Sequence, residues 1–204
     1  MNLLLLLVYF GLLIVAMSVH EFSHGWVAYK LGDTTAKYSG RLTLNPLAHI
    51  DPIGTVLLPL ILFISTRGQF VFGAAKPIPI NYWALKNPKR DIIWIGLSGP
   101  LANFLFAFAL SILWKIIPYI PIIDFIFKNL IFINVILGVF NLLPIPPLDG
   151  SRILMGILPK DLSARFAMIE PYGFIIVLLL VALGMFDFII WPLVRLILGL
   201  LMVS

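Results

Sequence analysis

Cysteine is absent from this chain, and charged residues are scarce. Of the 204 residues none is cysteine and 11% are charged, whereas about 25% of the residues of a typical soluble domain are charged. The lack of cysteine excludes disulfide bonds, thiolate zinc sites and cysteine nucleophiles. The shortage of charge excludes a soluble domain of ordinary composition.

Apolar sequence, by contrast, is abundant: 61% of the residues are hydrophobic and the mean hydropathy is +1.08. These values predict an all-α integral membrane protein with about five to six transmembrane helices, folded as a single domain over residues 1–204. The apolar runs that predict spans lie near residues 3–29, 91–114, 129–156, 171–185 and 188–203. The first run has no Lys or Arg before it and no A-x-A-like cleavage site, so we expect it to be retained.

Two segments that follow the first span have a different character. The apolar run 53–65 has 13 residues and contains Pro59. As a helix it would extend about 20 Å, less than the roughly 30 Å hydrocarbon core, and it therefore predicts a re-entrant segment. Residues 33–44 are rich in Thr and predict a small β-hairpin at the cytoplasmic side, and residues 70–72 predict another short strand.

The most informative motif is His20-Glu21-Phe22-Ser23-His24, an HExxH sequence inside the first apolar run. Residues four apart share a helix face, so His20 and His24 can both reach one Zn²⁺, with Glu21 beside them as the base for a water molecule. The alternative is that these side chains only form hydrogen bonds within a helix bundle. That alternative is unfavourable, because placing an ionisable residue at the centre of a span raises the free energy of membrane insertion by about 2.5–3.5 kcal/mol. Such residues are usually functional.

A catalytic zinc site needs a third protein ligand and an open position for water. The best candidate is Asp149, the only acidic residue of the predicted span 129–156. Pro144, Pro146 and Pro147 precede it, and because they lack N–H donors they interrupt the helix and leave room for water. Two alternatives remain: the prolines form a simple kink, and Asp149 caps a restarting helix, a role that is compatible with binding metal.

Three other polar positions are candidates for lesser roles. His49 could help to shape the site, although a structural role at the membrane surface is the interpretation we favour. Gly99 and Asn103 predict a close helix contact with a polar bond to a neighbour. Asn81 follows two prolines and lies either in an extended segment near substrate or in a turn.

These motifs together resemble those of the site-2 protease family of intramembrane zinc metalloproteases. The matching motifs are HEFSH (20–24), NPLAHIDPIGT (45–55), GAAKPIPIN (73–81), GPLANF (99–104) and NLLPIPPLDG (141–150). The resemblance covers roughly residues 11–156, the expected catalytic core, and residues 171–203 would add further transmembrane helices. The chain differs from larger members in showing no PDZ or nucleotide-sensing domain.

The resemblance implies the roles of individual residues. His20, His24 and Asp149 would hold one Zn²⁺ per chain, Glu21 would activate water, and Asn141 would assist near the reaction centre. The implied activity is hydrolysis of peptide bonds within or near transmembrane segments of membrane-protein substrates, as in regulated intramembrane proteolysis. The alternative from another class is a membrane zinc transporter, which would need His and acidic residues along a path through the membrane and usually paired sequence halves. Neither feature is present.

Charge and metal geometry together predict the topology. A shared zinc requires His20, His24 and Asp149 to lie at one depth, and basic residues follow both motifs closely. Eleven of the 14 basic residues then lie on the zinc side, which the positive-inside rule makes cytoplasmic, provided that residues 53–65 do not cross. We therefore expect a multi-pass protein of the cell membrane with its active site towards the cytoplasm. The net charge of +5 serves anchoring and orientation in the lipid bilayer and requires no nucleic-acid partner.

Overall fold

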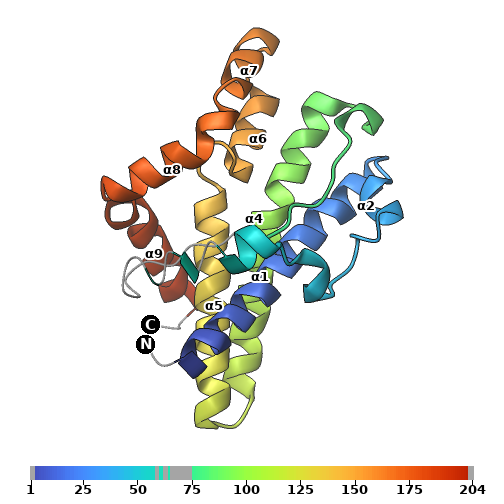
Figure 1. Cartoon of the computed structure of the whole chain (residues 1–204). Helices are drawn as coiled ribbons and strands as arrows, with labels where there is room; N and C mark the ends of the chain where they lie inside the picture. Colours follow the sequence, from blue (N-terminus) through green and yellow to red (C-terminus); the bar gives the residue numbers. More distant parts are fainter. Residues whose placement is uncertain (1–2, 58–59, 62–63, 65–74, 202–204) are drawn as a thin grey trace.

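The computed structural model of this chain describes every residue except 1–2, 58–59, 62–63, 65–74 and 202–204 (Figure 1). The described part is helical and has no β-strand, which confirms the all-α prediction. Its α-helices are α1 (Leu3–Lys30), α2 (Thr35–Tyr38), α4 (Pro88–Ile116), α5 (Pro121–Asn141), α6 (Asp149–Ile157), α7 (Lys160–Ala167), α8 (Gly173–Ala182) and α9 (Trp191–Leu201). Short 3₁₀ or π turns lie at η1 (Pro46–His49), η2 (Pro52–Leu57), η3 (Tyr82–Ala84), η4 (Glu170–Tyr172) and η5 (Phe186–Ile190).

Proline, aspartate and glycine set the bounds of the long helices. α4 begins at Pro88, because the missing N–H of proline is not needed in the first turn. The carboxylate of Asp91 accepts a hydrogen bond from the backbone N–H of Asn87 (2.9 Å) and so satisfies a donor at the helix start. α5 begins at Pro121 in the same way. After α1 the chain turns at Gly32, whose φ of 115° favours glycine.

Four helical stretches of the described chain are long and apolar enough to cross a membrane, namely Leu4–Lys30, Pro88–Ile116, Pro121–Asn141 and Lys160–Ala182. The first two agree with the predicted spans 3–29 and 91–114. At the predicted last span, α9 has 11 residues, fewer than the roughly 20 that a transmembrane helix needs. The prediction of five to six spans is therefore not confirmed.

Helices α1, α4 and α5 form the centre of the molecule. α4 and α5 are antiparallel neighbours joined by a short turn at the bottom of Figure 1, and α1 packs against both. The side chains of Ala16, Ala107, Ile131 and Val135 are fully buried in this contact. Because two of these residues are alanines, α1 and α4 can lie close together. The histidine face of α1 consequently rests on α4.

Two glycines allow α6 to pack closely on α4. A Cβ atom at Gly96 of α4 would lie 3.0 Å from the backbone oxygen of Asp149. A Cβ atom at Gly156 of α6 would lie 2.8 Å from the backbone oxygen of Lys89. Small residues at such positions let helix backbones approach each other. This contact fixes Asp149 relative to α4, and therefore relative to α1.

The predicted span 129–156 is wrong in its bounds. α5 begins earlier, at Pro121, and ends at Asn141, and helix resumes only at Asp149 with α6. The physical reason is the proline content of residues 144–147, because prolines offer no N–H to the preceding turn and cannot continue α5. Asp149 therefore lies at the start of a helix and not within a continuous span.

The predicted β-hairpin over residues 33–44 is also wrong. The segment instead forms the single turn α2. The carboxylate of Asp33 accepts a hydrogen bond from the N–H of Thr35 (2.9 Å) at its start, and Gly40, with a φ of 67°, follows it. Ala36 of this turn is fully buried. Local capping and burial outweigh the Thr-rich pattern here, because strand preference depends on a partner strand.

Two further predictions concern the chain between α2 and α4. The strand predicted at residues 70–72 lies outside the described residues, as do parts of the run 53–65. The described part of that run contains most of η2, a short turn and not a helix of spanning length. The re-entrant course of residues 53–65 therefore stays a prediction.

Replacing Gly156 with Ala should destabilise the protein by about 1–3 kcal/mol, because the new methyl group meets the Lys89 carbonyl and forces α6 away from α4. The matched control is Gly199→Ala in α9, where a Cβ atom meets nothing within 4 Å. The control should be neutral or stabilising by up to about 1 kcal/mol, since Ala favours helix over Gly. Thermal unfolding in detergent measures both changes, and equal midpoints would contradict the close contact of α4 with α6.

Candidate active site

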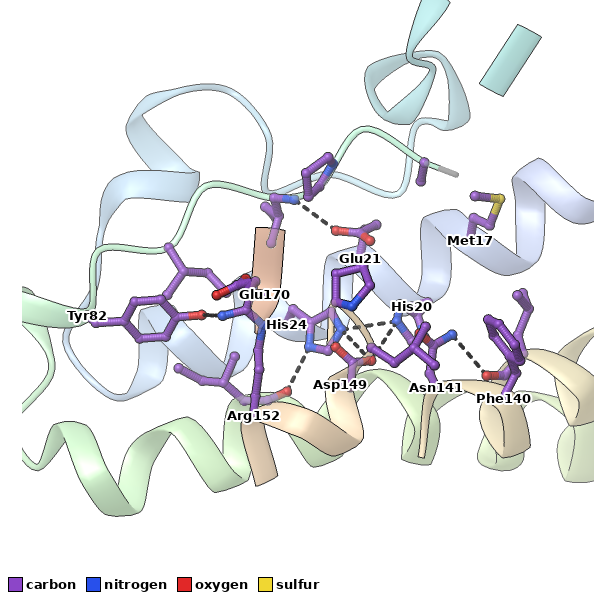
Figure 2. Close-up of a pocket in the computed structure, with 18 residues that line it drawn as sticks. Met17, His20, Glu21, His24, Tyr82, Phe140, Asn141, Asp149, Arg152 and Glu170 are labelled. Atoms are coloured by element: carbon purple, nitrogen blue, oxygen red, sulfur yellow. Dashed lines mark hydrogen bonds and ion pairs between the residues drawn. The ribbon is translucent and has the colours of Figure 1, made fainter. Parts of the chain in front are cut away.

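Three buried side chains from two helices come together beside a cavity. His20 and His24 lie one turn apart on α1, and Asp149 is the first residue of α6. The Nε2 atoms of the two histidines lie 3.0 Å and 3.2 Å from Oδ2 of Asp149 and 3.1 Å from each other. Figure 2 shows the three side chains turned towards one another. One ligand atom of each residue lies within 4.8 Å of the other two, so the three could hold one metal ion.

Hydrogen bonds behind each imidazole determine which nitrogen faces the centre of this cluster. Nδ1 of His24 lies 2.7 Å from the backbone oxygen of Ile95, and Nδ1 of His20 lies 2.6 Å from Oδ1 of Asn103. Carbonyl oxygens only accept hydrogen bonds, so both Nδ1 atoms act as donors. In neutral imidazoles the two Nε2 atoms then present lone pairs to the centre of the cluster.

Asp149 contributes a third electron-rich atom to the same point. Its Oδ2 is buried and lacks a hydrogen-bond donor, and the residue as a whole is 8% exposed. Lone pairs and a carboxylate gathered so closely are favourable only with a cation between them. Two imidazole nitrogens and a carboxylate oxygen are ligands that suit Zn²⁺ in a catalytic site, where three protein ligands leave one position open. The residues therefore fit the ion predicted from the sequence.

The open side of the cluster faces a cavity of about 590 Å³. Glu21 and Asn141, the two predicted catalytic residues, both line this cavity together with the three candidate ligands (Figure 2). Asn141 is the last residue of α5, and its Nδ2 donates to the backbone oxygen of Leu137 (3.0 Å). All five residues predicted for the site thus border one space.

An extended segment, residues 75–81, runs along the cavity beside Glu21. The backbone N–H of Ile78 donates to Oε2 of Glu21 (2.8 Å). Further along, the backbone N–H of Asn81 donates to Oδ2 of Asp33 (2.7 Å). The side-chain oxygen of Asn81 also accepts a hydrogen bond from the N–H of Trp83 (3.1 Å) at the start of η3, so Asn81 has the turn role predicted as one of its two alternatives. The segment is held by carboxylates from two different parts of the chain.

His49 lies outside the cluster of three candidate ligands. It is 2% exposed, and its Nε2 lies 2.8 Å from the backbone oxygen of Thr43. Its own backbone oxygen accepts a hydrogen bond from the N–H of Lys76 (2.9 Å). These contacts tie the loop before η2 to residues 75–81, which agrees with the structural interpretation of His49.

Three polar or charged residues of the cavity were not predicted to belong to the site: Tyr82, Arg152 and Glu170. The guanidinium of Arg152 donates to the hydroxyl of Tyr82 and lies 3.5 Å from Oε1 of Glu170. Burial raises the pKa of the Tyr82 phenol, and the positive charge of Arg152 opposes that rise. Arg152 alone had a signal in the sequence, because it follows Asp149 by three residues and so lies on nearly the same helix face.

Gly99 of α4 marks the closest approach of that helix to the two histidines. A Cβ atom at this position would lie 2.5 Å from Cε1 of His20 and 2.5 Å from Nε2 of His24. The missing side chain provides the space that the two rings occupy. The close helix contact predicted around Gly99 is confirmed, and the polar bond predicted for Asn103 is its contact with His20.

Comparisons with known proteins agree with this geometry. The sequence model of Peptidase family M50 matches residues 119–181. The chain is 38% identical to YwhC of Bacillus subtilis (strain 168), named as a zinc metalloprotease, over 192 residues that cover 90% of this chain and 84% of the relative. It is 32% identical to Rip2 of Mycolicibacterium smegmatis, also named as a zinc metalloprotease, over 82% of this chain and 63% of the relative. It is 25% identical to stage IV sporulation protein FB of B. subtilis over 76% of this chain and 52% of the relative. No solved structure matches the chain.

Replacing Gly99 with Ala should lower zinc affinity by about tenfold or more, because the methyl group would occupy the space of both imidazoles. Gly11→Ala in α1 is the matched control, since a Cβ atom there meets nothing within 4 Å. Zinc content after dialysis against a chelator of known affinity measures the difference between the two variants. Equal zinc retention would show that the rings do not depend on Gly99.

Proposed function

Because this chain belongs to Peptidase family M50, the site-2 protease family, we propose that His20, His24 and Asp149 are its zinc ligands. The protein is an intramembrane zinc metalloprotease. The observation that supports this ligand set is the convergence of the two Nε2 atoms on Oδ2 of Asp149, at 3.0 Å and 3.2 Å, within a helical bundle. A zinc ion held there supplies Lewis acidity, which activates water and polarises the scissile carbonyl. Nothing in the family membership supports the zinc-transporter alternative.

Glu21 is the general base in this proposal. It lines the same cavity and follows His20 directly in the sequence. One of its carboxylate oxygens accepts the Ile78 N–H, and in the described part of the chain no residue donates to the other. That second oxygen can accept a proton from the attacking water and later pass it to the leaving amine. The Ile78 N–H holds the carboxylate in place while this occurs.

Asn141 is assigned a contact with the reacting peptide bond. Its side-chain nitrogen has two hydrogens, and one of them is taken by the backbone oxygen of Leu137. The second hydrogen remains available to the carbonyl oxygen of a substrate in the cavity. A donor aimed at an oxygen that gains charge lowers the barrier to its formation.

The substrates in this proposal are transmembrane segments of other membrane proteins. A helical carbonyl already accepts a hydrogen bond and is shielded, so the segment must unwind locally before attack. An extended peptide can lie in the cavity alongside residues 75–81, which are themselves extended. The N–H groups of Lys76, Ile78 and Asn81 are already bonded, and Pro77 and Pro79 have none, so a substrate main chain would pair with the carbonyl oxygens of this segment, without reading its own side chains.

The orientation of the site is a proposal based on charge. With residues 53–65 staying on one side of the membrane, 11 of the 14 basic residues would lie on the zinc side, and the positive-inside rule favours a cytoplasmic location for it. Lys115, at the end of α4, and Lys128, near the start of α5, belong to the opposite side. The membrane in question would be the cell membrane.

Two substitutions separate the base from the ligands. Glu21→Gln should lower cleavage of a model transmembrane segment by about 10²–10⁴-fold while leaving bound zinc unchanged, because the change removes a proton acceptor and no ligand.

Asp149→Ala should instead lower zinc content together with activity, since one of three ligands is lost. Asp161→Asn, at an exposed residue of α7, is the control. Purified protein in detergent, assayed for metal content and chelator-sensitive cleavage, gives both readouts; full zinc and full activity in Asp149→Ala would refute the ligand set.

The topology is tested by single cysteines, which suit a chain that has none of its own. Cysteines introduced at Ser39, Asn87 and Pro121 replace exposed residues. An impermeant thiol reagent added outside intact cells should label only the variant at position 121. Labelling at position 87 would mean that residues 53–65 cross the bilayer, and the site would then face a different compartment.

A further inference from the structure

A row of buried amide side chains connects His20 to the far side of α4. Asn103 of α4 and Asn134 of α5 are both completely buried. Oδ1 of Asn103 lies 2.6 Å from Nδ1 of His20. Nδ2 of Asn103 donates to Oδ1 of Asn134 (2.7 Å) and lies 3.2 Å from the backbone oxygen of Ala16. The row therefore joins α1, α4 and α5, and the mechanism given above does not use it.

The far end of the row fixes the direction of every hydrogen bond in it. Nδ2 of Asn134 donates to the backbone oxygen of Leu130 (2.8 Å), an atom that can only accept. Asn134 must therefore turn its carbonyl oxygen towards Asn103. Asn103 in turn must present its NH₂ group to Asn134 and Ala16, and its oxygen to His20. The oxygen accepts, so His20 carries its hydrogen on Nδ1.

We propose that Asn103 and Asn134 are positioning residues that hold His20 in the tautomer whose Nε2 lone pair faces Asp149. This inference rests on the proposed zinc site, because only metal binding requires an unprotonated Nε2. Partners of this kind orient metal-binding histidines, and their loss typically weakens metal binding by about 10–100-fold. Both residues act through His20 and touch neither substrate nor the ion.

The two histidines differ in how their orientation is secured. Nδ1 of His24 lies 2.7 Å from the backbone oxygen of Ile95 and 3.2 Å from the Ser98 hydroxyl, and the nearer of the two, the carbonyl, is not removed by any side-chain substitution. His20 depends on the side-chain oxygen of Asn103, whose own orientation depends on Asn134. Substitutions in this row should therefore affect His20 and leave the tautomer of His24 unchanged.

A purely structural role would make the same amides a link between helices and nothing more. Asn103→Asp and Asn103→Leu separate the two roles. Asn103→Asp keeps an acceptor for His20 but loses the donor to Asn134 and Ala16, so it should weaken the helix contact and preserve zinc affinity. Asn103→Leu, which is similar in size, loses both and should weaken zinc affinity by about 10–100-fold.

Asn134→Leu tests the far end of the row and has a matched control on the same helix. Asn129 of α5 also donates to the backbone oxygen four residues before it, that of Phe125 (2.7 Å), but it does not contact Asn103. Asn134→Leu should weaken zinc binding less than Asn103→Leu does, because the Ala16 oxygen still orients Asn103. Asn129→Leu should leave zinc binding at the wild-type level.

The experiment combines zinc affinity, measured by competition with a chromophoric chelator, with ¹⁵N NMR of labelled histidine in zinc-free protein. The chain has three histidines, so His24 and His49 serve as internal references. Spectra recorded at alkaline pH, where the imidazoles are neutral, should show His20 with hydrogen on Nδ1 in wild type and in Asn103→Asp, and a mixture of tautomers in Asn103→Leu. Wild-type zinc affinity in Asn103→Leu, or an equal loss in Asn103→Asp, would overturn the inference.

The NMR measurement keeps the two proposals apart. If wild-type protein binds no zinc, the proposed ligand set fails, while the tautomer of His20 in zinc-free protein still decides the role of Asn103. If Asn103→Leu does not fold, Asn134→Leu compared with Asn129→Leu decides it, because the Asn103 side chain is then intact. An unchanged His20 spectrum in Asn134→Leu would count against the row as a positioning device.

Discussion

Two imidazoles and a carboxylate can share a buried site only when their outer polar atoms are bonded and their inner atoms meet a cation. In this protein the requirement governs the packing of three helices. α4 supplies the acceptors behind both histidines, through Asn103 and the carbonyl of Ile95. It also has glycine at the two positions where a side chain would displace the histidine rings or α6, Gly99 and Gly96. The helix that contributes none of the three proposed ligands is therefore the one that arranges all of them.

Hydrogen bonds to carboxylates also link the site to the chain between α2 and α4. Glu21 is bonded to the backbone of residues 75–81, and Asp33 holds the far end of that segment. Pro77 and Pro79 have no N–H groups, so the Ile78 N–H lies between two positions that cannot compete for the carboxylate. The proposed base, Glu21, is consequently held by a main-chain donor 57 positions away. Its position is as much a property of the loop as of the helix that carries it.

The sequence was sufficient where the determining interactions are local. His20 and His24 share a face because they are four residues apart, and Pro144, Pro146 and Pro147 identify the helix break before Asp149. Prediction failed where distant contacts decide the outcome. The Thr-rich segment 33–44 forms α2 and not a hairpin, since Asp33 caps the turn and also binds Asn81. Tyr82 and Glu170 both contact Arg152 beside the cavity, and no sequence spacing predicts contacts between residues so far apart in the chain. Asn134 was detectable in principle as an amide in an otherwise apolar run.

The order of the proposed ligands along the chain has a consequence for biosynthesis. Asp149 follows His24 by 125 positions, and its place depends on the packing of α6 against α4. A nascent chain therefore exposes the histidine pair long before the carboxylate has been translated. At that stage the growing polypeptide has the proposed base and two of the three proposed ligands. With all three proposed ligands required, zinc-dependent cleavage becomes possible only after the last part of the proposed catalytic core has been synthesised.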